Sequence, residues 1–278
     1  MKIYDRHERT YIEVEQYGAG KLRFLYGNAF GRILLKLAVS PLTSRIYGRI
    51  KSTRRSASKI PGFVEEYGID MSDYEDREYT SFNDFFSRKL KPGKRPLGEG
   101  FISPADSKLL VYDIKDELLI KGRTYKVSEL TGREDEDFEG GHALVFRLCM
   151  DDCHRFCYPA KGKCLSRNVI KGKLHTVSPI SKDYKIYKEN TRNVSILETE
   201  DYGKIAFIEV GAILVGRIVD NGDDFFEKGQ EKGYFEIGGS TIVVLTAPNI
   251  KIDEDILEQS RKGIETIVRY GERIGERC

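Results

Sequence analysis

Ser240 is the residue whose position most clearly allows unusual chemistry. It follows two glycines in the stretch KGYFEIGGST (232–241), which leads into the aliphatic run IVVL. Glycine inside a strand weakens it and often marks a bulge or a close backbone approach. Where the backbone is strained, the Ser240 hydroxyl can attack the carbonyl of Gly239 and convert the peptide bond into an ester. Loss of the β-oxygen then breaks the chain and leaves a dehydroalanine, which hydrolyses to a pyruvoyl group. A bulge capped by serine is the plainer interpretation.

Self-cleavage at Ser240 requires a general base beside its hydroxyl. His154 is our candidate, because it lies in a polar turn between apolar runs and the chain has four histidines in all. Histidine moves protons readily near neutral pH. Asp106, in the stretch SPADSK, is placed to hold the imidazole in the right tautomer, as in a Ser-His-Asp relay. On local grounds alone, His154 also fits a structural histidine and Asp106 an ordinary turn residue.

Four of the five cysteines cluster around His154, at positions 149, 153, 157 and 164. Their spacing does not match the pairs that bind zinc, so we predict no metal site. Cys157 is an alternative nucleophile, because Arg155 and His154 are close enough in sequence to stabilise a thiolate. The odd cysteine number and the charged N-terminus, which does not resemble a secretory signal, predict a reducing, cytoplasmic compartment without disulfides.

The segment 16–59 contains ten Lys or Arg residues and no Asp or Glu, although the whole chain has a net charge of +2. Apolar residues recur in it at helical spacing, with Phe24 and Leu35 on the opposite side and Pro41 at the expected end. The stripe comprises Leu22, Leu25, Tyr26, Ala29, Phe30, Ile33, Leu34 and Leu37. A basic amphipathic helix can lie in a bilayer interface or pack on its own core. No nucleic-acid motif accompanies the charge, and no stretch is apolar enough to span a membrane.

The elements that must position these residues are mostly strands. From about residue 100 onward, short β-branched runs alternate with glycine, asparagine and aspartate, until a helical pattern returns at 255–270. The predicted strands are 108–113, 143–148, 193–198, 205–210, 213–218 and 241–245. We therefore predict an α+β fold, with N-terminal helices followed by a β-rich catalytic domain of mostly antiparallel strands. The expected division is an N-terminal helical segment, 1–60, and a catalytic domain, 61–278.

Seven stretches in order make the chain resemble the phosphatidylserine decarboxylase family, from Phe82 to Leu245. They are FNDFFSRKLKPGKRP, SPADSK, DDCHRFCYPAKGK, KGKLHTVSPI, NTRNVSIL, IEVGAILVGRI and KGYFEIGGSTIVVL. Asp106 matches the family's relay aspartate, and Gly239-Ser240 matches its cleavage point in a GGST form. The family often has the pattern His-Arg-x-His-x-Pro, and the second histidine is Cys157 here. His154 is accordingly our choice of base, with His175 as the fallback and Cys157 as a further candidate.

The resemblance implies a self-processing, pyruvoyl-dependent carboxy-lyase. Its pyruvoyl group, derived from Ser240, would form a Schiff base with phosphatidylserine and release CO₂ to give phosphatidylethanolamine, without an external cofactor. The zymogen would be cut into chains 1–239 and 240–278, which stay together because 241–245 is a strand of the sheet. A lipid substrate favours the interfacial interpretation of the basic segment. We therefore expect a peripheral protein bound to the anionic membrane surface on the cytoplasmic face.

Other functions remain open at this point. A serine hydrolase could use Ser240, His154 and Asp106 on an external ester, but the serine precedes a strand and lacks the G-x-S-x-G elbow. A related decarboxylase acting on an archaeal-type phosphoserine lipid would need the same chemistry. A non-enzymatic lipid-binding module would need none of these residues. The sequence does not fix the oligomeric state, and a homodimer is one of the assemblies it allows.

Overall fold

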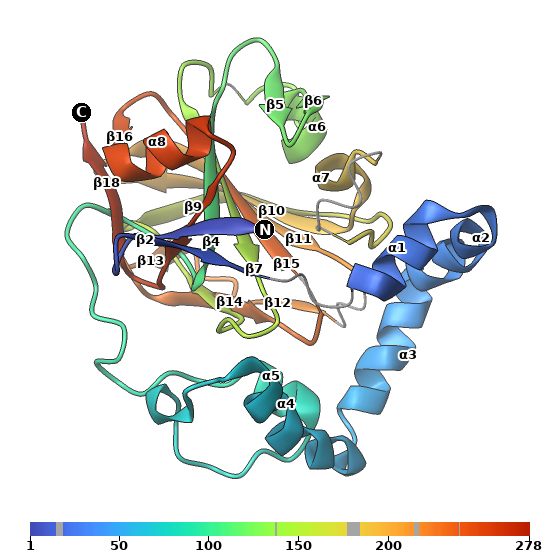
Figure 1. The fold of residues 1–278 in the computed structure, drawn as a ribbon. Helices are drawn as coiled ribbons and strands as arrows, with labels where there is room; N and C mark the ends of the chain where they lie inside the picture. The colour runs from blue at the N-terminus through green and yellow to red at the C-terminus, as the bar shows by residue number, and fades with distance from the viewer. Residues whose placement is uncertain (15–18, 137, 177–183, 214–216, 239) are drawn as a thin grey trace.

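The computed structural model describes residues 1–14, 19–136, 138–176, 184–213, 217–238 and 240–278. A large twisted sheet occupies the centre; the N-terminal helices lie to one side of it and below it, and further helices lie toward the top of the view (Figure 1). This arrangement confirms the predicted α+β class, with N-terminal helices followed by a β-rich region of mostly antiparallel strands. None of the helices in the described part of the chain has the length and apolar composition that a bilayer span requires.

The large sheet joins ten described strands in the order β13-β9-β10-β11-β15-β7-β4-β17-β1-β2. Neighbouring strands are antiparallel, except that β1 and β17 are parallel. In chain order they are β1 (Lys2–Asp5), β2 (Thr10–Glu13), β4 (Ser107–Asp113), β7 (His142–Leu148), β9 (Gly162–Ile170), β10 (Arg192–Thr199), β11 (Gly203–Gly211), β13 (Phe225–Phe226), β15 (Ser240–Thr246) and β17 (Glu265–Val268). Strand β15, which begins at the candidate nucleophile, is therefore a central strand.

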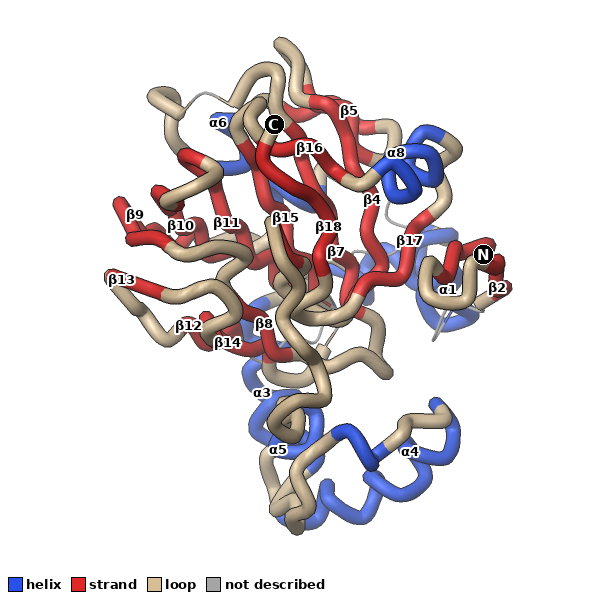
Figure 2. The backbone as a smooth tube through the Cα atoms, turned by 90° about the vertical axis from the view of Figure 1, so that its left-hand side faces the viewer, coloured by secondary structure: helices blue, strands red, loops and turns tan. Residues whose placement is uncertain are grey.

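Smaller sheets cover the large one. One contains β12 (Ile218–Asp220), β14 (Glu231–Phe235) and β8 (Arg155–Cys157), and it lies between the large sheet and the helices α3 (Pro41–Lys51) and α5 (Phe82–Phe86) in Figure 2. Another contains β16 (Ile250–Ile252), β18 (Arg273–Arg277) and β3 (Phe101–Ile102). Strands β5 (Leu118–Ile120) and β6 (Arg123–Tyr125) form a separate pair.

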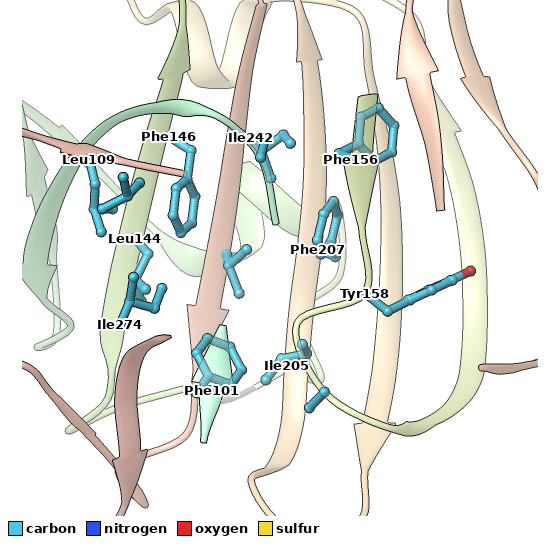
Figure 3. Close-up of a cluster of buried hydrophobic side chains, with 14 of the residues drawn as sticks. Phe101, Leu109, Leu144, Phe146, Phe156, Tyr158, Ile205, Phe207, Ile242 and Ile274 are labelled. Atoms are coloured by element: carbon cyan, nitrogen blue, oxygen red, sulfur yellow. The ribbon is translucent and has the colours of Figure 1, made fainter. Parts of the chain in front are cut away.

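The large sheet buries both of its faces. Successive residues of β15 enter two different hydrophobic clusters, because side chains alternate across a strand. Ile242 and Val244 pack with Phe156 and Phe235 of the small sheet on one face, while Val243 packs into the cluster on the other. Figure 3 shows the first cluster, in which Phe156 of the small sheet lies near Phe207 of the large sheet, with ring centroids 6.1 Å apart. The small sheet therefore covers the face on which Ile242 lies.

The predicted basic helix is two helices, α1 (Ala19–Gly27) and α2 (Ala29–Ala38), which are followed by α3. The break occurs at Asn28, whose side chain caps α2 by accepting a hydrogen bond of 2.7 Å from the Gly31 N–H. Pro41 begins α3 rather than merely ending the previous helix, since proline suits a first helical position. The remaining helices are η1 (Arg54–Lys59), α4 (Ile60–Tyr67), η2 (Met71–Asp73), α6 (Val127–Thr131), α7 (Ile186–Glu189) and α8 (Glu254–Arg261).

Three local expectations differ from the structure. Residues 2–13 form strands, because Ile3 pairs with Glu265 and is fully buried in the sheet. The helix expected over 255–270 is wrong beyond Arg261: Gly263 has a φ of 70°, which ends the helix, and β17 follows. The strand expected over 213–218 is not found as such, since β12 begins only at Ile218 and residues 214–216 lie outside the described part.

Candidate active site

Ser240 occupies the first position of β15, between two neighbouring strands. It faces Gly211 of β11 on one side and Leu148 of β7 on the other. The residue is fully buried, and its Oγ has no hydrogen-bond partner among the described residues. Gly238 has a φ of 135°, a conformation that side-chain-bearing residues rarely adopt. Gly239, the other half of the predicted cleavage point, lies outside the described residues.

The strand pairing brings His154 to the same region. Strand β7 pairs with β15, and β8 pairs with β14, so the β7–β8 and β14–β15 connections join the same two sheets. His154 lies at the end of the first connection, and its carbonyl accepts a 2.9 Å hydrogen bond from the Phe235 N–H. The second connection contains the predicted cleavage point before Ser240. The topology therefore places the two connections next to each other.

The imidazole of His154 is completely buried and packs against the ring of Phe86 of α5, with ring centroids 4.1 Å apart and ring planes tilted by 40°. Its Nδ1 lies 3.0 Å from the carbonyl oxygen of Asp152, which can only accept a hydrogen bond. Nδ1 therefore carries the proton, and Nε2, which has no partner in the described part of the chain, is left as an acceptor. Burial lowers the pKa of His154 to about 3, so the ring is neutral at physiological pH.

The loop that holds His154 is itself fixed by charged side chains. Arg88, which is fully buried, donates from Nη2 to the carbonyls of Asp151 (2.7 Å) and Asp152 (3.2 Å). The Asp152 carboxylate accepts from the Lys108 ammonium at 2.7 and 2.9 Å and from the Cys149 N–H at 2.7 Å. Burial raises the pKa of Asp152 to about 6 in spite of the lysine. These bonds hold in place the carbonyl that sets the tautomer of His154.

Asp106 lies at the correct end of the sheet but has other partners. It immediately precedes β4, in which Lys108 pairs with Arg147 of β7, close to the end where Ser240 lies. Its carboxylate accepts two hydrogen bonds from Arg95, at 3.1 and 2.8 Å, and one from the Tyr270 N–H at 2.7 Å. His154 bonds the Asp152 carbonyl instead. A direct relay from Asp106 to His154 is therefore not among the hydrogen bonds that the structure describes.

The two fallback bases have different surroundings. Cys157 is buried with its Sγ 3.9 Å from the Ser103 carbonyl, and burial raises its pKa to about 12, so it is a neutral thiol. His175 lies beneath α1, where its Nδ1 is 3.2 Å from the hydroxyl of Tyr26 and its ring stacks on Tyr184. Burial lowers its pKa as well. His175 therefore connects a helix to the core, whereas His154 lies beside the cleavage region.

The comparison with known families decides between the remaining functions. A family model described as phosphatidylserine decarboxylase matches residues 82–276. The chain belongs to the phosphatidylserine decarboxylase family.

Similar proteins match along the whole length. The chain is 49% identical to phosphatidylserine decarboxylase proenzyme 2 of Clostridium acetobutylicum, over 99% of this chain and 98% of that protein. It is 39% identical to a phosphatidylserine decarboxylase proenzyme of Ruminiclostridium cellulolyticum, over 99% and 97% of the two chains. It is 38% identical to that of Clostridium perfringens, over 100% of both. Membership of the phosphatidylserine decarboxylase family confirms the predicted enzyme class, a carboxy-lyase that is made as a proenzyme.

The sequence assigned no role to three residues that shape this decarboxylase site: Asn83, Phe86 and Arg88. All three lie in the stretch FNDFFSRKLKPGKRP, which carried part of the family resemblance. Their chemistry gives no local signal, because an asparagine, a phenylalanine and an arginine in a short helical turn are ordinary. Only the tertiary contacts reveal their roles: Phe86 packs against the base, Asn83 bonds the segment before Ser240, and Arg88 holds the loop that carries His154.

A metal role for the neighbouring acidic groups is not supported. Ligand atoms of Cys149, Asp151 and Asp152 lie within 4.8 Å of one another. However, the ammonium of Lys108 already bonds both carboxylate oxygens of Asp152. Asp152 is therefore one half of an ion pair that supports the His154 loop.

Proposed function

We propose that this chain is a phosphatidylserine decarboxylase whose catalytic domain, 61–278, cuts itself between Gly239 and Ser240. The observation that carries the proposal is a pair of buried polar atoms without partners in the described part of the chain. They are Oγ of Ser240 and Nε2 of His154. A buried hydroxyl and a buried neutral imidazole that lack partners are costly unless they interact with a reacting group. His154 ends one of the two neighbouring connections and Ser240 directly follows the other, as self-cleavage requires.

The proposed cleavage uses only groups of this chain and water. The Ser240 oxygen bonds to the carbonyl carbon of Gly239 while its proton passes to Nε2 of His154. The peptide C–N bond breaks and the amine takes up that proton, so an ester replaces the amide. Removal of the α-proton of residue 240 expels the Gly239 carboxylate and leaves dehydroalanine. Its imine tautomer then takes up water and releases ammonia, which yields a pyruvoyl group on the chain 240–278.

The surroundings of Ser240 fit such a group. A pyruvoyl carbonyl supplies an electron sink for decarboxylation of an amine-bearing substrate. The position is buried between two central strands, which exclude water and hold the new N-terminus in the sheet. His154 would be placed to return a proton to the substrate carbon after CO₂ has left, once its Nε2 has taken that proton from the substrate amine. Phosphatidylserine, which the names of the relatives specify, is the substrate that we assign.

The exposed apolar residues of α2 and α3 support binding to a membrane. Phe30, Ile33, Leu37, Leu42, Ile46 and Ile50 are between 51% and 65% exposed. On α2, the buried contact is instead made by Leu35, which the helical pattern placed on the opposite side. Arg32, Lys36, Arg45 and Arg49 are exposed beside the apolar residues. We infer that this surface, which we name the α2–α3 face, lies on an anionic bilayer with the basic residues at the lipid headgroups.

The proposed function is tested by following chain cleavage and CO₂ release together. Ser240→Ala should yield an uncut, inactive chain that still binds vesicles. Thr241→Val, a change at the next position of the same strand, is the matched control and should process normally. Decarboxylation by uncut Ser240→Ala would contradict the proposal. A serine hydrolase that uses the same residues would instead be active as one intact wild-type chain.

A further inference from the structure

The short helix α5 contacts both the proposed base and the segment that precedes the proposed cleavage site. Phe86 packs against His154, and it also shares a hydrophobic cluster with Ile237, which lies three positions before Ser240. Asn83, on the same helix, accepts a 2.8 Å hydrogen bond from the Ile237 N–H through its Oδ1. One rigid turn therefore touches the base and also the segment that leads to the scissile bond.

Asn83 is well placed to fix the approach of that segment. The residue is buried, and Ile237 is 2% exposed, so water does not replace the bond between them. Ile237 is followed by two glycines, the residues with the greatest backbone freedom. A reacting carbonyl held by a freely moving loop would rarely reach the geometry for attack, which requires contact within about 3–3.5 Å. The bond to Asn83 limits that freedom directly before the glycines.

The amide of Asn83 is in turn oriented by α3. Its Nδ2 donates to Oγ of Ser52 at 3.2 Å, and the Ser52 hydroxyl donates to the Gly48 carbonyl at 2.9 Å. Ser52 is the C-terminal cap residue of α3, and Gly48 lies within that helix. A continuous set of hydrogen bonds therefore runs from α3, through Ser52 and Asn83, to Ile237. The oxygen of Asn83 faces Ile237 because its nitrogen is held by Ser52.

We propose that Asn83 is a positioning residue for self-cleavage, and that Ser52 links its orientation to α3. The proposal rests on the cleavage between Gly239 and Ser240 that we assign above. Among the described residues, Asn83 bonds Ile237 and not Ser240, so it acts through Ile237. Its effect should therefore appear in the rate of cleavage, and much less in the turnover of protein that has already been cut.

The test measures the cleavage time course of freshly translated full-length protein on denaturing gels. Asn83→Leu keeps the size of the side chain but leaves the buried Ile237 N–H without an acceptor, so cleavage should slow by about tenfold or more. Asn83→Asp retains an acceptor and should recover most of the rate. Ser52→Ala should slow cleavage by about threefold, and the double variant Ser52→Ala/Asn83→Leu should be no slower than Asn83→Leu alone.

Ser87→Ala is the matched control, because it removes only local hydrogen bonds of the same segment to the carbonyls of Asn83 and Asp84. It should be cleaved at the wild-type rate. Thermal unfolding of each variant in an uncut Ser240→Ala background separates slow cleavage from poor folding. If Asn83→Leu is unstable, the cleavage rates of the more conservative Asn83→Asp and Ser52→Ala variants still test the inference. Normal cleavage of a folded Asn83→Leu, or additive effects in the double variant, would overturn the inference. Cleavage of Ser240→Ala itself would instead overturn the proposed function.

Discussion

Nδ1 of His154 lies 3.0 Å from the carbonyl oxygen of Asp152, and that carbonyl is also held by buried Arg88. The tautomer of the imidazole is therefore set by a main-chain acceptor. This arrangement leaves Nε2 as the free acceptor in a ring that burial keeps neutral. A neutral imidazole with a free Nε2 is the form that a general base needs.

His154→Ala should therefore block cleavage, because it removes the proton acceptor for Ser240. We expect the full-length chain to accumulate, with a rate loss of at least about a hundredfold, within the usual range for general-base catalysis. Denaturing gels of freshly translated protein measure this effect. His175→Ala and Cys157→Ala serve as comparisons and should retain cleavage. If His154→Ala is cut normally while one of these variants is not, the base is the other residue.

The buried histidine should also make stability depend on pH. Its pKa falls from about 6.5 in the unfolded chain to about 3 in the folded protein, so the folded state binds fewer protons between these values. Stability is then fully present above pH 6.5 and is lost as the pH falls toward 3. In an uncut Ser240→Ala background, the unfolding free energy should rise less steeply with pH in His154→Gln. The slope between pH 4 and 6 should be smaller by up to about 1.4 kcal/mol per pH unit. Denaturant unfolding checks this, and equal slopes would contradict it.

The α2–α3 face should bind vesicles that contain phosphatidylserine. Ile33→Asp together with Leu37→Asp should weaken binding by more than about tenfold, because both burial of apolar surface and attraction to anionic lipid are lost. Vesicle flotation measures the effect. Val169→Asp and Phe225→Asp change residues that are 60% and 78% exposed on β9 and β13, and they provide the matched control. Equal loss of binding in both pairs would contradict the assigned surface.

Lys232 is fully buried and donates to Oε1 of Glu209 at 2.6 Å and to Asp220. Lys232→Met should cost about 3–5 kcal/mol of unfolding free energy, because it leaves a buried carboxylate without its cation. Burial already raises the pKa of Glu209 to about 7, so the loss should be larger at high pH. Adding Glu209→Leu should restore most of the stability in denaturant titrations. A double variant as unstable as the single one would show that the loss has another cause.

Much of the sheet could be predicted from the sequence, because strands such as β7 and β15 consist of local runs of aliphatic residues. The ends of the chain could not. Ile3 pairs with Glu265, and no local pattern indicates which distant segment will add a strand to the edge of a sheet. The break between α1 and α2 could not be predicted either, since the apolar stripe continues on both sides of Asn28.

In the candidate site, too, some residues can be predicted from the sequence and others cannot. Ser240 and His154 can be predicted from the sequence, because their side chains have distinctive chemistry and their motifs resemble a known family. Asn83 bonds a residue 154 positions away, so its role depends on the fold and not on its neighbours in sequence. Asp106 was expected to orient the histidine, whereas its carboxylate bonds Arg95 and the Tyr270 N–H. The type of a residue indicates what it can do, and only the packing determines which partner it meets.

The most direct measurement is the intact mass of freshly purified, active protein with and without a reagent that traps carbonyl groups. We predict two chains that together account for residues 1–278, the smaller running from 240 to 278 with a blocked N-terminus that gains the mass of the reagent. A single unbroken chain of 31.8 kDa that decarboxylates its substrate and does not react with the reagent would contradict the account.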